Sequence, residues 1–248
     1  ALIFMKEVSS KSNIYHWWRL IIKYHTQKFK AKANRLQVSL LQRNLKHDSV
    51  FFDVGANKGI FSFWACKQMG SGGCVHAFEP QPELSWVFSK IQSSLGIKNF
   101  FFNNFALSDL SSQLMLTRSC VGHGSASLIN VSNESCDSIM VDVSTLDDYC
   151  EQMKISKLDF IKIDVEGNES KTIAGGLQTV QKFLPTMLIE MTASEETRSS
   201  IKFFKSLGYS VKMIIAGTCF EETTNTFAEF IDSSFEQDSL HADFFFYI

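Results

Sequence analysis

From residue 49 onward, apolar runs of strand length alternate with stretches of helical periodicity, and this alternation constrains the fold more than any other feature. The runs predicted as strands are 49–55 (SVFFDVG), 73–80 (GCVHAFEP), 99–108 (NFFFNNFALS), 157–167 (KLDFIKIDVEG), 185–191 (PTMLIEM), 209–215 (YSVKMII) and 241–248 (HADFFFYI). Helices are predicted over 58–70, 82–96, 144–153, 168–183 and 200–208. Such alternation is typical of an α/β domain with a largely parallel sheet and helices on both faces.

Two segments depart from this alternation of strands and helices. Within residues 107–144, LSSQLMLT and DSIMVDVS have strand-like composition and flank a Gly/Ser-rich loop, which predicts a β-hairpin insertion. Residues 221–240 contain six acids and neither lysine nor arginine, and we interpret them as a solvated loop. We divide the chain into an N-terminal helical extension or lid, 1–47, and a main domain, 48–248.

The composition narrows the class of protein. The chain has 248 residues, of which 45% are hydrophobic and 20% charged, as expected for a folded domain, and its net charge of −2 gives no overall attraction to nucleic acid or anionic membranes. The six cysteines form no C-x-x-C pair, which indicates reduced thiols in a cytoplasmic protein. No apolar run reaches the roughly 18 residues of a membrane span, and the first residues make a poor signal peptide.

The segment 11–46 is strongly basic. It carries nine lysines and arginines, no acid, and apolar residues at helical spacing. One interpretation is a helix that lies on a membrane surface, which would make the protein membrane-peripheral. The other is a helical lid packed on the domain with a solvated basic face, and this is favoured because amphipathic helices usually pack on their own protein.

The first predicted strand runs into a loop of a ligand-binding type, FFDVGANKG. Ligands of open α/β sheets bind beyond the carboxyl ends of the strands. Gly55 allows a tight turn and Gly59 allows close packing of the helix on the strand, as in dinucleotide-binding loops. Asn57, however, stands where a third glycine would let a pyrophosphate approach the backbone. The loop therefore favours a nucleoside with an amino-acid head, such as S-adenosylmethionine.

Two further strands carry acids at their ends. Glu79 follows Gly59 by twenty positions, close to the spacing at which an acid meets ribose hydroxyls. In FIKIDVEG, Lys162, Asp164 and Glu166 share one face of a strand that should be buried. Because unpaired buried charges are costly, we expect Lys162 to pair with a neighbouring acid deeper in the sheet, while Asp164 and Glu166 emerge at the ligand end, beside Glu190. The alternative is a surface ion network on an edge strand.

These motifs, in the order FFDVGANKG, HAFEP, NNFALSD, VSTLDDY and DFIKIDVEGNE, resemble the FkbM-type family of S-adenosylmethionine-dependent methyltransferases over about residues 49–192. The resemblance implies a class I methyltransferase fold, Rossmann-like, whose seven-stranded sheet has an antiparallel last strand. It also implies O-methylation of a hydroxyl on a sugar or secondary metabolite, so that the partner is a small-molecule or glycan acceptor. By position, the cofactor-binding residues it implies are Asp53, Gly55, Asn57, Gly59, Glu79, Asn104 and Ala106, with Asp164 near the reacting methyl group.

A hydroxyl acceptor must lose a proton, and the candidate bases are Asp164, Glu166 and His123, the last in the insertion loop. Together with Glu190, the first two could instead gather a divalent cation. Spacing alone does not select either chemistry, and we favour a metal-free base.

Three alternatives stay open. A nucleic-acid methyltransferase is disfavoured because no proline begins a Pro-Pro-aromatic or Pro-Cys motif. The basic segment 11–46 nevertheless leaves RNA binding as an alternative. A nicotinamide oxidoreductase is disfavoured by Asn57. A non-catalytic nucleoside-binding scaffold could dock a partner or membrane through residues 11–46.

Overall fold

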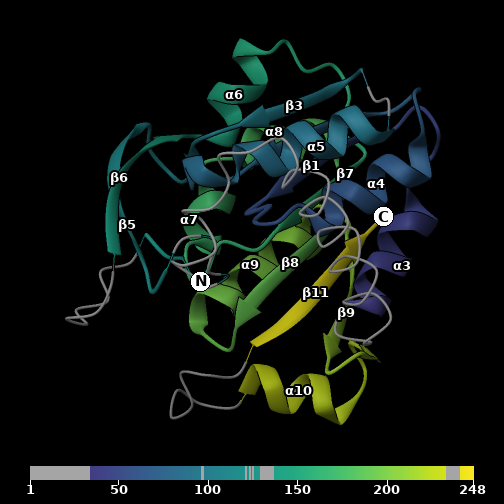
Figure 1. Cartoon of the computed structure of the whole chain (residues 1–248). Helices are drawn as coiled ribbons and strands as arrows, with labels where there is room; N and C mark the ends of the chain where they lie inside the picture. Colours follow the sequence, from purple (N-terminus) through teal and green to yellow (C-terminus); the bar gives the residue numbers. More distant parts are fainter. Residues whose placement is uncertain are drawn as a thin grey trace.

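A computed structural model describes residues 34–95, 98–120, 122, 124, 126–128, 137–232 and 241–248. Its main sheet has the strand order β10-β9-β11-β8-β7-β1-β2-β3 (Figure 1). These strands are β1 (Val50–Val54), β2 (Cys74–Phe78), β3 (Phe100–Asn103), β7 (Phe160–Ile163), β8 (Thr186–Thr192), β9 (Ser210–Ile215), β10 (Thr218–Glu221) and β11 (His241–Tyr247).

Strands β3, β2, β1, β7 and β8 run parallel, and β11 is antiparallel to both of its neighbours, β8 and β9. This confirms the class I methyltransferase fold, including the antiparallel last strand. The short strand β10, which pairs with β9, adds an eighth strand at the edge.

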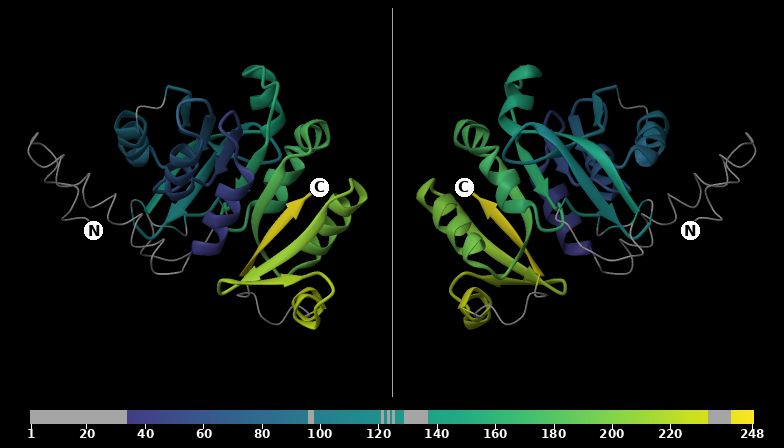
Figure 2. Two further views of the ribbon diagram at one scale, coloured as in Figure 1. Left: turned by 90° about the vertical axis from the view of Figure 1, so that its right-hand side faces the viewer. Right: turned by 90° about the vertical axis from the view of Figure 1, so that its left-hand side faces the viewer.

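Helices cover both faces of the sheet, and Figure 2 shows the two layers on opposite sides. They are α3 (Arg35–Asn44), α4 (Ile60–Met69), η1 (Pro82–Leu84), α5 (Ser85–Leu95), α6 (Leu146–Gln152), α7 (Glu169–Ala174), α8 (Leu177–Phe183), α9 (Glu195–Ser206) and α10 (Asn225–Asp232). The sheet has a hydrophobic core on each face, and alternate residues of β1 belong to different cores. Phe51 packs with residues of α3 to α5, and Phe52 packs with residues of α6 to α10.

The insertion forms its own small sheet, ordered β4-β6-β5, with β4 (Ala106–Leu107), β5 (Ser112–Arg118) and β6 (Asp137–Ser144). The predicted hairpin is the antiparallel pair β5–β6. The predicted strand 99–108 is wrong as a single element, because it divides into β3 and β4, which belong to different sheets. The chain turns between them at Asn104, whose side-chain amide donates a hydrogen bond of 2.9 Å to the backbone oxygen of Glu79.

Three other expectations need correction. The predicted helix 168–183 is two helices, α7 and α8, separated by Gly175 and Gly176. Gly175 lies against the insertion, where a Cβ atom would be 2.0 Å from the Ser108 carbonyl oxygen. Strand β7 ends at Ile163, earlier than predicted. The acidic segment contains the last residue of β10 and all of α10, whose Phe227 and Phe230 are buried against Phe244.

The basic segment falls largely outside the described residues. Its described part, α3, buries Val38 and Leu41 in the same core as Phe51. Over the described part of the chain, no helix combines the length and apolarity needed to cross a membrane. Membrane contact, a cytoplasmic location and the division of the chain at residue 47 stay predictions.

Candidate functional site

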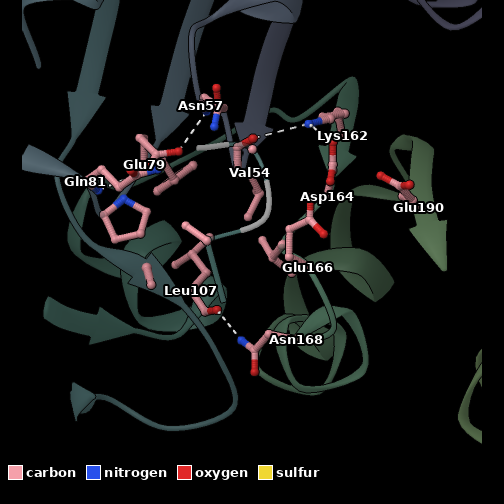
Figure 3. A pocket seen from close by; sticks show the side chains of 18 of the residues that line it. Val54, Asn57, Glu79, Gln81, Leu107, Lys162, Asp164, Glu166, Asn168 and Glu190 are labelled. Carbon is pink, nitrogen blue, oxygen red and sulfur yellow. Dashed lines mark hydrogen bonds and ion pairs between the residues drawn. The ribbon is translucent and has the colours of Figure 1, made fainter. Parts of the chain in front are cut away.

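A cavity of about 340 Å³ opens at the carboxyl ends of the central strands, the place where open α/β sheets bind ligands (Figure 3). The loop after β1, the segment after β2, the ends of β7 and β8, and the insertion all contribute to its wall. Of the residues singled out in the sequence, the cavity brings together Gly55, Asn57, Glu79, Ala106, Asp164, Glu166 and Glu190.

The loop after β1 has left-handed backbone at three positions: Gly55 (φ 72°), Asn57 (φ 45°) and Gly59 (φ 69°). Asparagine is among the few non-glycine residues that adopt this conformation readily. The left-handed backbone therefore explains why an asparagine can occupy position 57, in addition to the ligand preference that the sequence suggested. At Gly55 the loop also touches the end of β7, because a Cβ atom there would lie 1.7 Å from the Asp164 carbonyl oxygen.

Gly55→Ala is expected to lower the free energy of unfolding by about 2–4 kcal/mol, because the methyl group adds a backbone collision to the left-handed strain. Urea denaturation measures the loss. Gly70→Ala is the matched control, since Gly70 has a φ of 67° and nothing within 4 Å of an added Cβ. Equal losses in the two variants would contradict the close approach of the two loops.

Glu79 is held at one end of the cavity with its side chain 4% exposed. Its Oε2 accepts a hydrogen bond of 2.8 Å from the Asn57 backbone N–H, and its Oε1 accepts one of 3.0 Å from the Gln81 N–H. Burial raises the pKa of Glu79, and these hydrogen bonds oppose that rise. Each carboxylate oxygen can accept a second hydrogen bond, so this side chain suits a pair of ligand hydroxyls.

Three predicted cofactor residues do not line the cavity. Asp53 is completely buried, and its Oδ2 accepts hydrogen bonds from the N–H and hydroxyl of Ser62, at 2.9 and 2.6 Å. Gly59 begins α4 and packs against α5, where an added Cβ would lie 2.7 Å from Ile91 Cδ1. Asn104 holds the backbone behind Glu79. These residues shape the walls rather than face the cavity, and His123 lies outside the described residues.

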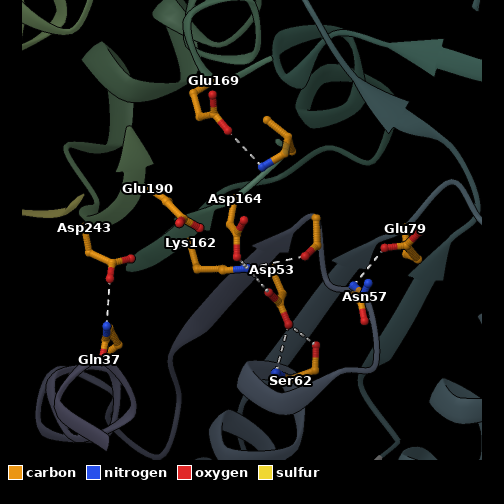
Figure 4. A network of polar contacts seen from close by, with 12 residues as sticks. Gln37, Asp53, Asn57, Ser62, Glu79, Lys162, Asp164, Glu169, Glu190 and Asp243 are labelled. Atoms are coloured by element: carbon orange, nitrogen blue, oxygen red, sulfur yellow. Dashed lines mark hydrogen bonds and ion pairs between the residues drawn. The ribbon is translucent and has the colours of Figure 1, made fainter. Parts of the chain in front are cut away.

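Lys162 is paired, but its nearer partner is Asp164 rather than an acid deeper in the sheet (Figure 4). Lys162 is 5% exposed, and its Nζ lies 2.9 Å from Asp164 Oδ2 and 4.0 Å from Asp53 Oδ1. The same Nζ donates a 3.3 Å hydrogen bond to the Gly55 carbonyl oxygen. One buried cation thus joins the loop after β1 to the end of β7.

Asp164, Glu166 and Glu190 meet at the other end of the cavity from Glu79 (Figure 3). Glu166 has a left-handed backbone (φ 52°), and burial, followed by the charge of Asp164, raises its pKa to about 7. Burial and Asp164 also raise the pKa of Glu190. A carboxyl with a pKa near neutrality is suited to accept a proton at physiological pH.

Within the described residues, no three His, Cys, Asp or Glu side chains gather as ligands of one metal ion. The described lining includes four carboxylates, those of Glu79, Asp164, Glu166 and Glu190, and two amines, those of Lys58 and Lys162. Four acids against two amines favour a ligand with positive groups over one with phosphates, and a bound positive group would in turn lower the raised pKa values of Glu166 and Glu190.

Sequence reasoning missed several lining residues. Gln81 lies two residues after Glu79 and is 1% exposed, but nothing in the surrounding sequence indicated that it lines a ligand site. Ala126 and Leu128 line the cavity from the Gly/Ser-rich loop, which drew attention only for His123. Asn34, before α3, also reaches the cavity.

The sequence and the fold of this chain are similar to those of known methyltransferases. The model of the methyltransferase FkbM domain matches residues 53–211. The 2-O-methyltransferase NoeI of Sinorhizobium fredii (strain NBRC 101917 / NGR234) is 28% identical over 167 residues, which are 61% of this chain and 65% of NoeI, so about a third of NoeI has no counterpart in the match. The crystal structure of a methyltransferase FkbM from Methylobacillus flagellatus KT shares the fold, with a TM-score of 0.53 and 14% identity over 82% of this chain and 44% of that one.

Proposed function

This chain belongs to the FkbM methyltransferase family, and from this premise we propose that it transfers the methyl group of S-adenosylmethionine to a hydroxyl of a sugar or another small-molecule acceptor. The observation that carries the proposal is one cavity with a buried carboxylate, Glu79, at one end and a cluster of carboxylates with raised pKa values at the other. The name of NoeI, an O-methyltransferase, supports oxygen as the accepting atom.

The residues of the cavity fit S-adenosylmethionine. Its ribose has two neighbouring hydroxyls, which suit the two oxygens of Glu79. Its sulfonium and ammonium groups are positive, which suits the end formed by Asp164, Glu166 and Glu190. A dinucleotide would instead bring a diphosphate, which these carboxylates would repel.

Glu79→Gln tests the cofactor end of this proposal. The substitution keeps the shape of the side chain but replaces one accepting oxygen with a donor, so the affinity for S-adenosylmethionine should fall about 5- to 150-fold. Calorimetric titration with S-adenosylhomocysteine measures the dissociation constant. Glu151→Gln, at an exposed position of α6, should bind as the wild type does. An unchanged affinity in Glu79→Gln would remove Glu79 from cofactor binding.

At the acceptor end, Glu166 is proposed to take the proton of the attacking hydroxyl. When bound, S-adenosylmethionine would supply an electrophilic methyl group: the acceptor oxygen would bond to the methyl carbon as the carbon–sulfur bond breaks, and the electron pair of that bond would stay on sulfur. Glu166 is positioned for this role by the left-handed turn at the end of β7, and its pKa of about 7 leaves a large fraction ionised at neutral pH. Asp164, paired with Lys162, adds negative charge beside it.

Methyl transfer itself is tested by incubating the protein with S-adenosylmethionine labelled in its methyl group and with a panel of mono- and oligosaccharides. We expect label in a stable ether of at least one acceptor. Binding of S-adenosylmethionine without transfer to any hydroxyl compound would favour the scaffold alternative. Transfer into RNA would favour the nucleic-acid alternative.

A further inference from the structure

We infer that Arg118, on strand β5 of the insertion, is a positioning residue that fixes the cofactor end of the cavity. It acts through Gln81 on Glu79, and it fixes the insertion to the segment that follows β2, where Glu79 lies. This inference rests on the proposed function, because it concerns the binding of S-adenosylmethionine by Glu79.

The Arg118 guanidinium is buried, with 2% of the side chain exposed, and it has a hydrogen-bond partner for every N–H group. Nη1 and Nη2 each donate to one carboxylate oxygen of Glu83, both at 2.8 Å. Nε and Nη2 donate to Asp137 Oδ2 at 3.0 and 2.8 Å, and Nη1 also donates to Gln81 Oε1 at 3.4 Å. A buried cation is tolerated only when it is paired in this way.

The partners of Arg118 come from separate parts of the fold. Glu83 lies in η1, directly after the second strand of the main sheet, whereas Asp137 begins β6 of the insertion. Because the arginine fork holds both carboxylates at fixed geometry, it sets the position of the insertion relative to the segment that carries Glu79.

Gln81 connects this cluster to the cofactor end. Its Oε1 accepts hydrogen bonds from Arg118 and from the Gly122 backbone N–H, the latter at 2.8 Å. Its own backbone N–H donates to Glu79 Oε1 at 3.0 Å. Arg118 and the proposed ribose-binding carboxylate are therefore linked through a single residue, and that residue is itself part of the cavity wall.

The insertion is also fixed to the acceptor end. Thr117, the neighbour of the arginine, exchanges two backbone hydrogen bonds of 2.9 Å with Ser127. The Ser127 hydroxyl donates to the backbone oxygen of Glu166 at 2.7 Å, and Ala126 and Leu128 on either side line the cavity. The same strand of the insertion thus contacts both ends of the site.

Arg118→Lys tests the role, because lysine keeps the charge but lacks the planar fork. At saturating acceptor, we expect the KM for S-adenosylmethionine and the dissociation constant of S-adenosylhomocysteine to rise about tenfold, while kcat changes less than threefold, as expected when binding geometry is lost. Lys157→Met is the matched control. Lys157 bridges two acids, Asp48 and Asp159, which precede the central strands β1 and β7 and lie at the end of the sheet opposite the cavity.

A purely structural role would lower thermal stability in Arg118→Lys and leave cofactor affinity unchanged, and that result would overturn the inference. A double-mutant cycle with Gln81→Leu tests the route. The two losses of affinity should not add, because both substitutions break the same connection, whereas fully additive losses would exclude Gln81 as the link.

If Arg118→Lys does not fold, Glu83→Gln supplies the milder test. This substitution removes the negative charge of one Arg118 partner and keeps the shape of its side chain. Its affinity for S-adenosylhomocysteine should fall in the same direction, and unchanged affinity would overturn the inference. Failure of the proposed function is distinguishable, since the wild-type protein itself would then bind no S-adenosylmethionine.

Discussion

Replacing Lys162 with methionine is expected to lower the free energy of unfolding by about 3–5 kcal/mol, the usual cost of removing one partner from a buried ion cluster. Lys162 lies between Asp164 and the fully buried Asp53, so its removal leaves both carboxylates without the cation that joins them. Urea denaturation at pH 7 measures the loss.

The pH dependence of this loss is a second readout. Burial raises the pKa of Asp53, and Lys162 opposes that rise, so the pKa should be higher still in Lys162→Met. A carboxyl whose pKa is raised by folding stabilises the protein when protonated and loses that contribution as pH increases. The deficit of the variant should therefore grow as pH rises from the folded-state pKa of Asp53 in the wild type to its higher pKa in the variant, an interval that lies above the ordinary aspartate pKa of about 4.

The exposed ion pairs of Lys157 provide the comparison for this experiment. Lys157→Met should cost less than about 1 kcal/mol, because its pairs with Asp48 and Asp159 are accessible to water. An equally small loss in Lys162→Met would contradict the buried cluster.

Glu166→Gln is expected to lower kcat by about 100- to 10,000-fold, the usual contribution of a general base. The affinity for S-adenosylmethionine should fall much less than kcat, because two further acids, Asp164 and Glu190, line this end of the cavity and Glu79 is unchanged at the other end (Figure 3). Steady-state kinetics with a methylated acceptor separates the two effects.

The pH profile identifies the group. In the wild-type protein, kcat/KM for S-adenosylmethionine should rise with pH through about 7 as free Glu166 loses its proton, and then level off. The residual activity of Glu166→Gln should lack this limb. Glu190→Gln is the rival variant: a larger loss there, with the limb intact in Glu166→Gln, would assign the base to Glu190.

The sequence predicted the central part of the fold because local patterns determine it. The apolar run of β1 and the two glycines of the loop that follows it, Gly55 and Gly59, are short-range features. The sequence also predicted that Lys162 is paired, since a buried lysine requires a partner, but not that Asp164 is the nearer partner. The family and the class I topology were predicted from a resemblance, which the five sequence motifs from FFDVGANKG to DFIKIDVEGNE carry by their order.

Other features depend on contacts between distant residues, which a single sequence does not reveal. The predicted helix 168–183 is divided at Gly175, where Ser108, 67 residues earlier in the chain, leaves no room for a side chain. Phe227 and Phe230 have helical spacing, but the surrounding acids suggested a solvated loop, and only their contact with Phe244 explains α10. The link from Arg118 to Gln81 likewise spans 37 positions.

The most direct test of the account is a crystal structure of the protein with S-adenosylhomocysteine. We predict both ribose hydroxyls within hydrogen-bond distance of the Glu79 carboxylate and the sulfur atom turned toward Asp164 and Glu166. A ligand bound outside this cavity, or one whose ribose makes no contact with Glu79, would contradict it.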